Sequence, residues 1–344
     1  MIHKTIDIVS WVNINNKLYF KSYRGMPGLF CYDILYKKLE LIKEPAEVYR
    51  SWEKYGYSTG IGSINKYVVF APHNAKKFIV LNTESMEILS FDKKRLAVYT
   101  ASVEYDGKLI IFAKKLSDSV VFDSRSLLFE YPFSSQPSSI ETRLVGCVKR
   151  KGKRVILSTQ HKDCVAEIDL ESYCVNIRFL KELDIVYNMV ILCGDNYILT
   201  GDKPLLVIWD GTAKTETLKL DSSWMRPQTI PWPDLFFGAV IKEEKAFFCP
   251  QNYKMLTCFD LTTKKIEYLY EMEEKEHACM NELPEGLLLS IIEEDSPKRN
   301  CLYRYDGRAE DCTIFDFKDE FKLSGASIEY SRKALQYFID DLIL

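Results

Sequence analysis

The sequence has few of the features that usually mark an enzyme, an exported protein or a membrane protein. Only 4 of its 344 residues are histidine. No stretch approaches the roughly 18 apolar residues of a membrane-spanning helix, and the first residues contain neither a continuous apolar segment nor a small-residue cleavage site. The chain is therefore expected to be a soluble, cytoplasmic protein that does not insert into a membrane.

The sequence also contains little that would indicate a metal site or a nucleic-acid interface. The 10 cysteines form no C-x-x-C pair and no Cys/His spacing typical of zinc ligands. Most of them are expected to be reduced, small core residues. The formal net charge of −3 does not favour a nucleic-acid partner. No metal and no other cofactor is predicted.

What the sequence does contain is an internal repeat. The segment FAPHNAKKFIVLNTES (70–85) recurs as FCPQNYKMLTCFDLTT (248–263). More divergent copies end, like these two, in an apolar run followed by aspartate or asparagine, with a spacing of roughly 45 residues that indicates a repeat array. The seven residues at this position are Asp33, Asn82, Asp123, Asp169, Asp210, Asp260 and Asp306.

Each unit has the pattern of four short strands in a meander. Residues 144–180, for example, contain the strand-like runs LVGCVKR, RVILSTQ, CVAEIDL and CVNIRFL. Turn-forming residues separate the first two strands of every unit. These turns are predicted at Asn15-Asn16, Asn65-Lys66, Asp106-Gly107, Lys151-Gly152, Gly194-Asp195, Glu243-Glu244 and Glu285-Gly286.

The composition of the strands indicates how the units pack. Runs such as YVVF, FIVL and LLVIW are continuously apolar, so both faces of each sheet must be covered. The first strand of several units carries small residues, including Gly62, Ala101, Gly238 and Ala278. Small side chains would fit where the innermost strands converge on a common axis.

In these features the sequence resembles the seven-bladed β-propellers of the YVTN/WD40-like superfamily, through cores such as VAEIDLESYCV (165–175) and LTCFDLTTKKI (256–266). The resemblance implies an all-β propeller of four-stranded antiparallel blades over residues 1–317. The repeated glycine-histidine and tryptophan-aspartate pairs of true WD40 repeats are absent, and Trp209-Asp210 is a solitary instance. The ring is expected to close by packing the terminal blades together, or else by pairing residues 6–9 with the last blade.

Residues 318–344 are predicted to form a C-terminal tail with a short amphipathic helix. Leu335, Phe338, Ile339 and Leu342 follow the spacing of one helix face. Such a helix could pack on the propeller wall or dock a partner. The apolar stripe is the same in both cases, so the two alternatives remain open.

Two long, aromatic connections lead into the two units that share the loop motif P-[HQ]-N-x-K, and they favour a binding platform on that face. The alternative is that their aromatic rings fold back and plug the channel mouth. The candidate ligand- or partner-binding residues are Trp52, Tyr55, His73, Asn74, Lys76, Trp224, Arg226, Trp232, Gln251, Asn252 and Lys254.

No catalytic residue is predicted, because the histidines fall into no Ser-His-Asp or Cys-His arrangement. His73 occupies a loop position that is Lys114, Gln160, Gly201 or Gln251 in other units, which favours a structural role. The leading hypothesis is a scaffold that binds a protein or peptide, with a glycan as a variant. The competing hypothesis is a lyase, hydrolase or cyclase that acts on a carbohydrate or peptide, with Arg24, His73, Glu104 and His161 as candidates.

Overall fold

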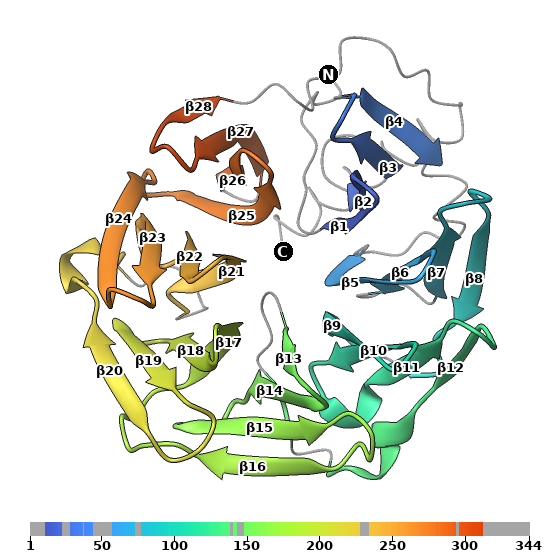
Figure 1. Cartoon of the computed structure of the whole chain (residues 1–344), viewed down its shortest axis with the longest axis horizontal. Coiled ribbons are helices and arrows are strands. Elements are labelled where there is room, and N and C mark those ends of the chain that lie inside the picture. Colours follow the sequence, from blue (N-terminus) through green and yellow to red (C-terminus); the bar gives the residue numbers. More distant parts are fainter. Residues whose placement is uncertain are drawn as a thin grey trace, which may run out of the picture.

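The protein is a ring of seven β-sheets around a central axis (Figure 1). The computed structural model describes residues 11–22, 28–36, 38–43, 57–72, 77–95, 97–137, 140–142, 148–227, 234–293 and 296–311. Within these ranges each sheet contains four antiparallel strands that follow one another in the sequence. The predicted all-β fold and the resemblance to a seven-bladed β-propeller are therefore confirmed.

The strands are numbered along the chain, and each group of four forms one blade. Blade 1 contains β1 (Trp11–Ile14), β2 (Lys17–Ser22), β3 (Gly28–Asp33) and β4 (Lys38–Lys43). Blade 2 contains β5 (Tyr57–Ile64), β6 (Tyr67–Pro72), β7 (Lys77–Asn82) and β8 (Ile88–Asp92). Blade 3 contains β9 (Tyr99–Tyr105), β10 (Lys108–Ala113), β11 (Val120–Asp123) and β12 (Leu128–Glu130), with the short 3-10 turns η1 (Leu116–Asp118) and η2 (Pro132–Ser135).

Blades 4 to 7 follow the same order. Blade 4 contains β13 (Arg150–Lys151), β14 (Arg154–Ser158), β15 (Cys164–Asp169) and β16 (Val175–Phe179). Blade 5 contains β17 (Tyr187–Cys193), β18 (Asn196–Gly201), β19 (Leu205–Trp209) and β20 (Thr215–Lys219), followed by η3 (Ser222–Trp224). Blade 6 contains β21 (Phe236–Lys242), β22 (Lys245–Pro250), β23 (Met255–Asp260) and β24 (Lys265–Glu271). Blade 7 contains β25 (Glu276–Leu283), β26 (Gly286–Glu293), β27 (Ser296–Arg304) and β28 (Ala309–Asp311).

The core consists of seven apolar clusters, and each cluster lies between two neighbouring blades. Successive side chains of a strand point to opposite faces of its sheet. In β6, Val68 and Phe70 pack toward blade 1, whereas Val69 and Ala71 pack toward blade 3. This alternation between two covered faces is why the strands read as continuously apolar in the sequence.

The first and last blades pack against each other through buried side chains. Phe20 and Phe30 of blade 1 share one buried cluster with Leu283, Leu288 and Leu302 of blade 7. The rings of Phe20 and Phe30 are stacked, with centroids 5.6 Å apart. The alternative closure through residues 6–9 and the helix predicted within 318–344 lie outside the described residues.

Five of the seven predicted turns between first and second strands are confirmed at their predicted positions. In blade 4 the turn lies one residue later, at Gly152-Lys153, and in blade 7 one residue earlier, at Pro284-Glu285. The glycine of blade 7, Gly286, belongs to β26 instead. A Cβ atom there would lie 2.2 Å from the carbonyl oxygen of Tyr303, so this glycine serves close strand packing.

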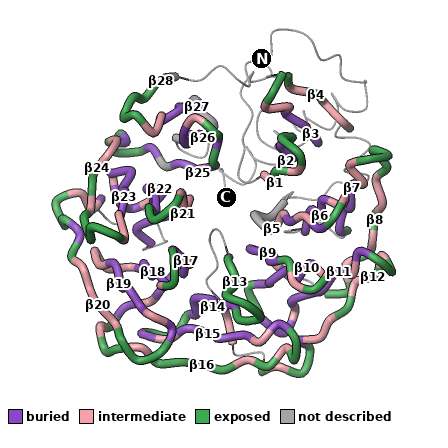
Figure 2. Tube along the Cα trace, viewed as in Figure 1, coloured by how far each residue is buried: buried purple, intermediate pink, exposed green. Residues whose placement is uncertain are grey.

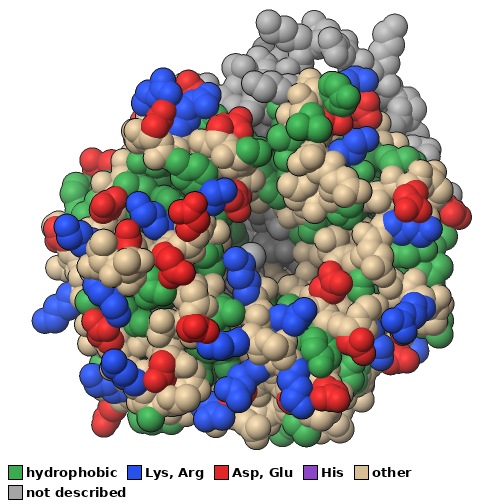
Figure 3. Space-filling view, in the orientation of Figure 1, with side chains coloured by type: hydrophobic (Ala, Val, Ile, Leu, Met, Phe, Trp, Pro, Cys, Tyr) green, Lys and Arg blue, Asp and Glu red, His purple; other side chains and the backbone are tan. Residues whose placement is uncertain are grey.

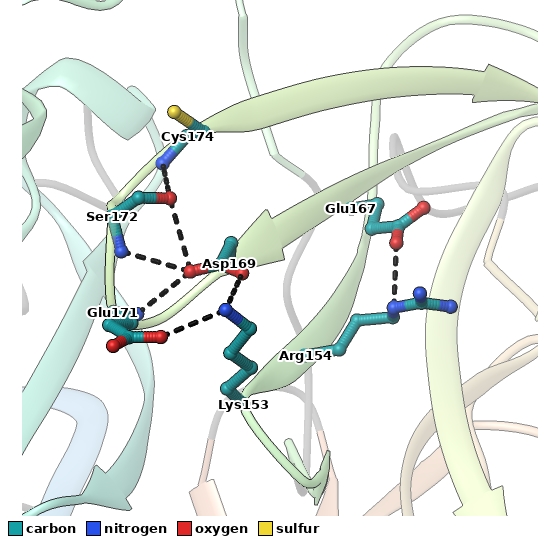
Figure 4. A network of polar contacts seen from close by, with 7 residues as sticks. All are labelled: Lys153, Arg154, Glu167, Asp169, Glu171, Ser172 and Cys174. Atoms are coloured by element: carbon teal, nitrogen blue, oxygen red, sulfur yellow. Dashed lines mark hydrogen bonds and ion pairs between the residues drawn. The ribbon is translucent and has the colours of Figure 1, made fainter.

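The aspartate or asparagine that recurs in every blade caps the turn between the third and fourth strands. In all seven blades its Oδ1 atom accepts a hydrogen bond from the backbone N–H two or three residues later. In blade 4, Asp169 accepts from Glu171 (3.0 Å) and Ser172 (2.9 Å), and its Oδ2 pairs with Lys153 at 3.2 Å (Figure 4). The repeat signal is therefore a local structural requirement.

The small residues of the inner strands have more than one cause. A Cβ atom on Gly62 would lie 2.3 Å from Ser102 Oγ, so blades 2 and 3 approach each other there as predicted. At Gly238 no atom lies within 4 Å of an added Cβ, which contradicts the steric explanation for this glycine. Gly238 lies instead at a register irregularity between β21 and β22.

Burial follows the position of a strand in its blade, whereas charges of both signs are mixed. The middle strands of the blades are mostly buried, whereas the outer strand β16 is exposed over most of its length (Figure 2). On the face shown in Figure 3, acidic and basic side chains are intermixed around a central hollow. No helix among the described residues is long and apolar enough to cross a membrane.

Candidate functional site

The connection from blade 5 to blade 6 begins with a capped turn. After β20, Asp221 caps η3, because its Oδ1 accepts hydrogen bonds from the Ser223 N–H (2.9 Å) and hydroxyl (2.7 Å). These hydrogen bonds, the backbone one first, lower the pKa of the Asp221 carboxyl. The cap directs the chain toward Trp224, the last residue of η3.

The next residues pair with the loop between β22 and β23. The Lys254 N–H donates to the Trp224 carbonyl and the Arg226 N–H donates to the Asn252 carbonyl, both at 2.9 Å. Between them, Met225 and Tyr253 form an antiparallel bridge. We call this pairing of residues 224–226 with residues 252–254 the loop ladder. It joins two segments that contain four of the candidate binding residues: Trp224, Arg226, Asn252 and Lys254.

A second set of hydrogen bonds ties the same loop to the start of blade 6. Both the backbone N–H and the side-chain Nδ2 of Asn252 donate to the Asp234 carbonyl, at 3.3 and 3.1 Å. The Gln251 N–H donates to the Leu235 carbonyl at 2.9 Å. Asn252 is only 5% exposed, so the asparagine of the repeated motif has a structural role in this blade. Gln251 is partly exposed and lies beside it.

Aromatic contacts join the loop ladder to the core. Tyr253 is fully buried, and its ring packs on Phe236 and Tyr268 with centroids 5.4 and 6.2 Å apart. Its hydroxyl donates to the Asp221 carbonyl at 2.8 Å, and burial raises the pKa of Tyr253. Trp224 packs on Tyr268, with ring centroids 6.4 Å apart, yet stays partly exposed. Trp224 therefore contributes to the core between blades 5 and 6 and remains accessible from outside.

Arg226 is the most unusual member of the ladder. It is 7% exposed, and it is the one buried lysine or arginine in the described part of the chain. Within that part, neither its Nε nor its Nη2 atom has a hydrogen-bond partner. Burial lowers the pKa of Arg226, and the carboxylates of Glu276 and Glu274 oppose this shift. The guanidinium is thus charged, desolvated and only partly satisfied.

The structure brings together five of the eleven predicted binding residues. They are Trp224, Arg226, Gln251, Asn252 and Lys254. The other six lie outside the described residues: Trp52, Tyr55, His73, Asn74, Lys76 and Trp232. Sequence reasoning missed Tyr253, Asp221 and Glu276. Only Tyr253 carries a sequence signal, since it is an aromatic residue inside the repeated loop motif.

The residues of the competing enzyme hypothesis do not meet in the described structure. Glu104 lies at the end of β9 next to the turn at 106–107. His161 lies in the loop between β14 and β15, and is exposed. Because the strands of adjacent blades run alongside each other, these two residues occupy opposite faces of the ring. Arg24 and His73 lie outside the described residues.

Other reactive groups are few where the chain is described. No group of three or more His, Cys, Asp or Glu side chains in the described ranges is arranged to hold a metal ion. Six of the eight cysteines there are buried, as the sequence predicts for most of them. Burial raises the pKa of Cys31 to about 11 and that of Cys258 to about 12. Both thiols therefore stay protonated at neutral pH.

Comparison with known proteins supports the fold. No protein-family model matches the chain, and no curated protein does. A streptogramin B lyase structure matches with a TM-score of 0.56 and 15% identity over 78% of this chain and 85% of the lyase. Virginiamycin B lyase from Staphylococcus aureus matches with a TM-score of 0.55 and 11% identity over 78% and 86%.

A third similar structure is the β-propeller domain of Cps50 (Swd1) from Myceliophteria thermophila. Its TM-score is 0.54, with 10% identity over 85% of this chain and 97% of that domain. At these identities the likeness shows the fold alone.

Proposed function

We propose that this propeller is an interaction module that binds a protein or peptide partner through the loop ladder and the side chains around it. The observation that carries the proposal is the convergence of Trp224, Arg226 and Lys254 on one hydrogen-bonded ladder. Tryptophan and arginine are the residue types most enriched among side chains that dominate binding energy. Lys254 and Gln251, both partly exposed, provide polar contacts at the rim.

The rigidity of the ladder supports a binding role. Backbone hydrogen bonds hold it on both sides, and Tyr253 anchors it to the capped turn at Asp221. A surface that is already ordered loses little conformational entropy when a partner binds. An ordered ladder would favour a glycan ligand equally, with the Trp224 ring stacked on a sugar.

An enzyme is the competing function, because streptogramin B lyase and virginiamycin B lyase share this fold. The separation of Glu104 and His161 on opposite faces of the ring favours binding over catalysis by that set of residues. The loop ladder offers hydrogen-bond donors and an aromatic ring. These groups suit recognition of a partner.

The test is affinity capture from native cell extract with the wild type and three variants. Trp224→Ala removes the ring, and Lys254→Glu reverses a charge while keeping the backbone N–H that the ladder uses. Phe179→Ala is the matched control, since Phe179 is an aromatic residue 63% exposed on the distant strand β16. We expect a stoichiometric partner that is lost with both ladder variants and retained with Phe179→Ala. A partner retained equally by all variants, or no partner at all, would contradict the proposal.

A further inference from the structure

Arg226 differs from the other described arginines in how its guanidinium is satisfied. Arg154 donates from Nε to Glu167 at 2.7 Å, and Arg178 pairs with the same carboxylate. Arg95 donates from Nη1 to the Ser117 carbonyl (3.1 Å) and to the Asp118 carboxylate (3.2 Å). Among the described arginines only Arg226 is buried, and its Nε and Nη2 donors are both unmatched.

The two unmatched atoms belong to one edge of the guanidinium group. Their N–H bonds run nearly parallel, and this is an edge on which the two oxygens of a carboxylate dock side by side. Burying a charged donor without an acceptor is costly, and adding a matched acceptor recovers that cost. Both atoms are shielded from solvent, so a ligand has to displace the atoms that cover this edge in order to reach it.

The charges around Arg226 favour a ligand with a single negative charge over a dianion. Glu276 is fully buried, and its Oε2 accepts a hydrogen bond from the Glu273 N–H at 3.1 Å. Glu274 is exposed and acts on Arg226 from the solvent side. Two acidic neighbours would repel a dianion such as phosphate more strongly than a monoanion. A carboxylate meets both the geometric and the charge requirement.

We propose that Arg226 binds a carboxylate group of the partner side-on through Nε and Nη2. The proposal rests on the proposed function, because the loop ladder holds Arg226 at the surface that would receive the partner. The carboxylate can come from the C-terminus of a peptide or from an aspartate or glutamate side chain. Both sources present the same planar, singly charged group.

The first experiment uses small probes with the full chain, so that no partner needs to be known. The Nε–H resonance of Arg226 is followed by NMR with ¹⁵N-labelled arginine, and is assigned as the signal missing in Arg226→Lys or Arg226→Gln. N-acetylglycine represents a C-terminus, N-acetylaspartic acid amide represents an acidic side chain, and N-acetylglycinamide is the neutral control. Inorganic phosphate tests the charge argument.

We expect a saturable shift of the Arg226 signal with at least one of the two carboxylate probes, and the stronger probe identifies the source. The neutral amide should cause no saturable shift, and phosphate should bind more weakly than the carboxylates. No saturable shift with either carboxylate, or equal shifts with the amide, would overturn the proposal. Tighter binding of phosphate would overturn the preference for a monoanion.

Variants provide a second readout, in which the change in Tm of the protein is measured with the same probes. Arg226→Lys keeps the charge but loses the paired edge, so the affinity for the carboxylate should fall about tenfold or more. Arg95→Gln is the matched control, because Arg95 lies in the corresponding connection between blades 2 and 3 and already has partners. If a variant does not fold, the comparison of the carboxylate probes with N-acetylglycinamide on the wild type still tests the proposal.

The outcomes separate this inference from the proposed function. If Arg226 binds a carboxylate but no partner is captured, the carboxylate site is supported and the proposed interaction module is contradicted. If capture of a partner depends on Trp224 and Lys254 but not on Arg226, the interaction module is supported and the carboxylate site is contradicted.

Discussion

Substitution of Gly62 by alanine should destabilise the ring, because this position has no room for a Cβ atom. The added atom would lie 2.3 Å from Ser102 Oγ and 2.9 Å from Leu109 Cδ1, both on blade 3. The hydroxyl can rotate away, but it then gives up its 3.0 Å hydrogen bond to the Ile61 carbonyl. That loss is worth about 1 kcal/mol, and displacement of Leu109 raises the total to about 1–3 kcal/mol.

Gly238→Ala is the matched control, because it lies on another inner strand where nothing is within 4 Å of the new atom. It should leave stability unchanged or raise it by about 0.5 kcal/mol through the unfolded state. In thermal melts of a chain this long, each kcal/mol corresponds to a shift in Tm of about 1–2 °C. Denaturant midpoints therefore give the sharper comparison.

A double substitution tests the steric cause directly. In Gly62→Ala/Ser102→Ala the nearest clashing atom is gone, so the pair should cost less than the sum of the single variants. Equal destabilisation at Gly62 and Gly238 would refute the steric reasoning. So would strict additivity of the substitutions at Gly62 and Ser102.

Two further predictions concern hydrogen bonds of the loops. Tyr253→Phe removes the donor to the Asp221 carbonyl and should cost about 1 kcal/mol in denaturant unfolding, whereas Tyr36→Phe, at an 81% exposed position, should cost nothing measurable; equal effects would contradict the anchoring role. Hydrogen bonding, first from the Ser172 N–H, lowers the pKa of Asp169 from 3.8 to about 2. The Asp169 carboxylate contributes its full stabilisation above the unfolded-state pKa of 3.8, and this contribution is lost as the pH falls through about 2. Asp169→Asn should therefore reduce the change in the free energy of unfolding between pH 3.8 and about 2. An unchanged pH profile would show that Asp169 does not contribute.

The architecture could be predicted from the sequence because every blade has the same local requirement at one turn. A turn between third and fourth strands needs an acceptor for its N–H groups, and an Asp or Asn side chain supplies it in each blade. The errors arose where one residue type serves two purposes. Gly286 resembles a turn glycine, but the close approach of Tyr303 requires it.

The candidate site was only partly readable. The sequence places Trp224 and Arg226 in one loop and Asn252 and Lys254 in another, and the propeller topology brings these loops to one face. It could not show that the two loops hydrogen-bond to each other, since that depends on the path of both chains in space. Nor could it show that Arg226 is buried, because a charged loop residue is exposed by default.

A ring of similar blades has to obtain its function from departures from the repeat. The capping Asp and Asn residues occur in all seven blades, so they explain the fold and cannot distinguish one blade from another. The asparagine of the loop motif has a structural role in blade 6, where it binds the Asp234 carbonyl. Arg226 has neither property: it belongs to no repeated motif, and within the described structure its Nε and Nη2 atoms have no hydrogen-bond acceptor. A buried cation whose paired donors lack an acceptor can bind a carboxylate, which is why the search for a partner should begin at Arg226.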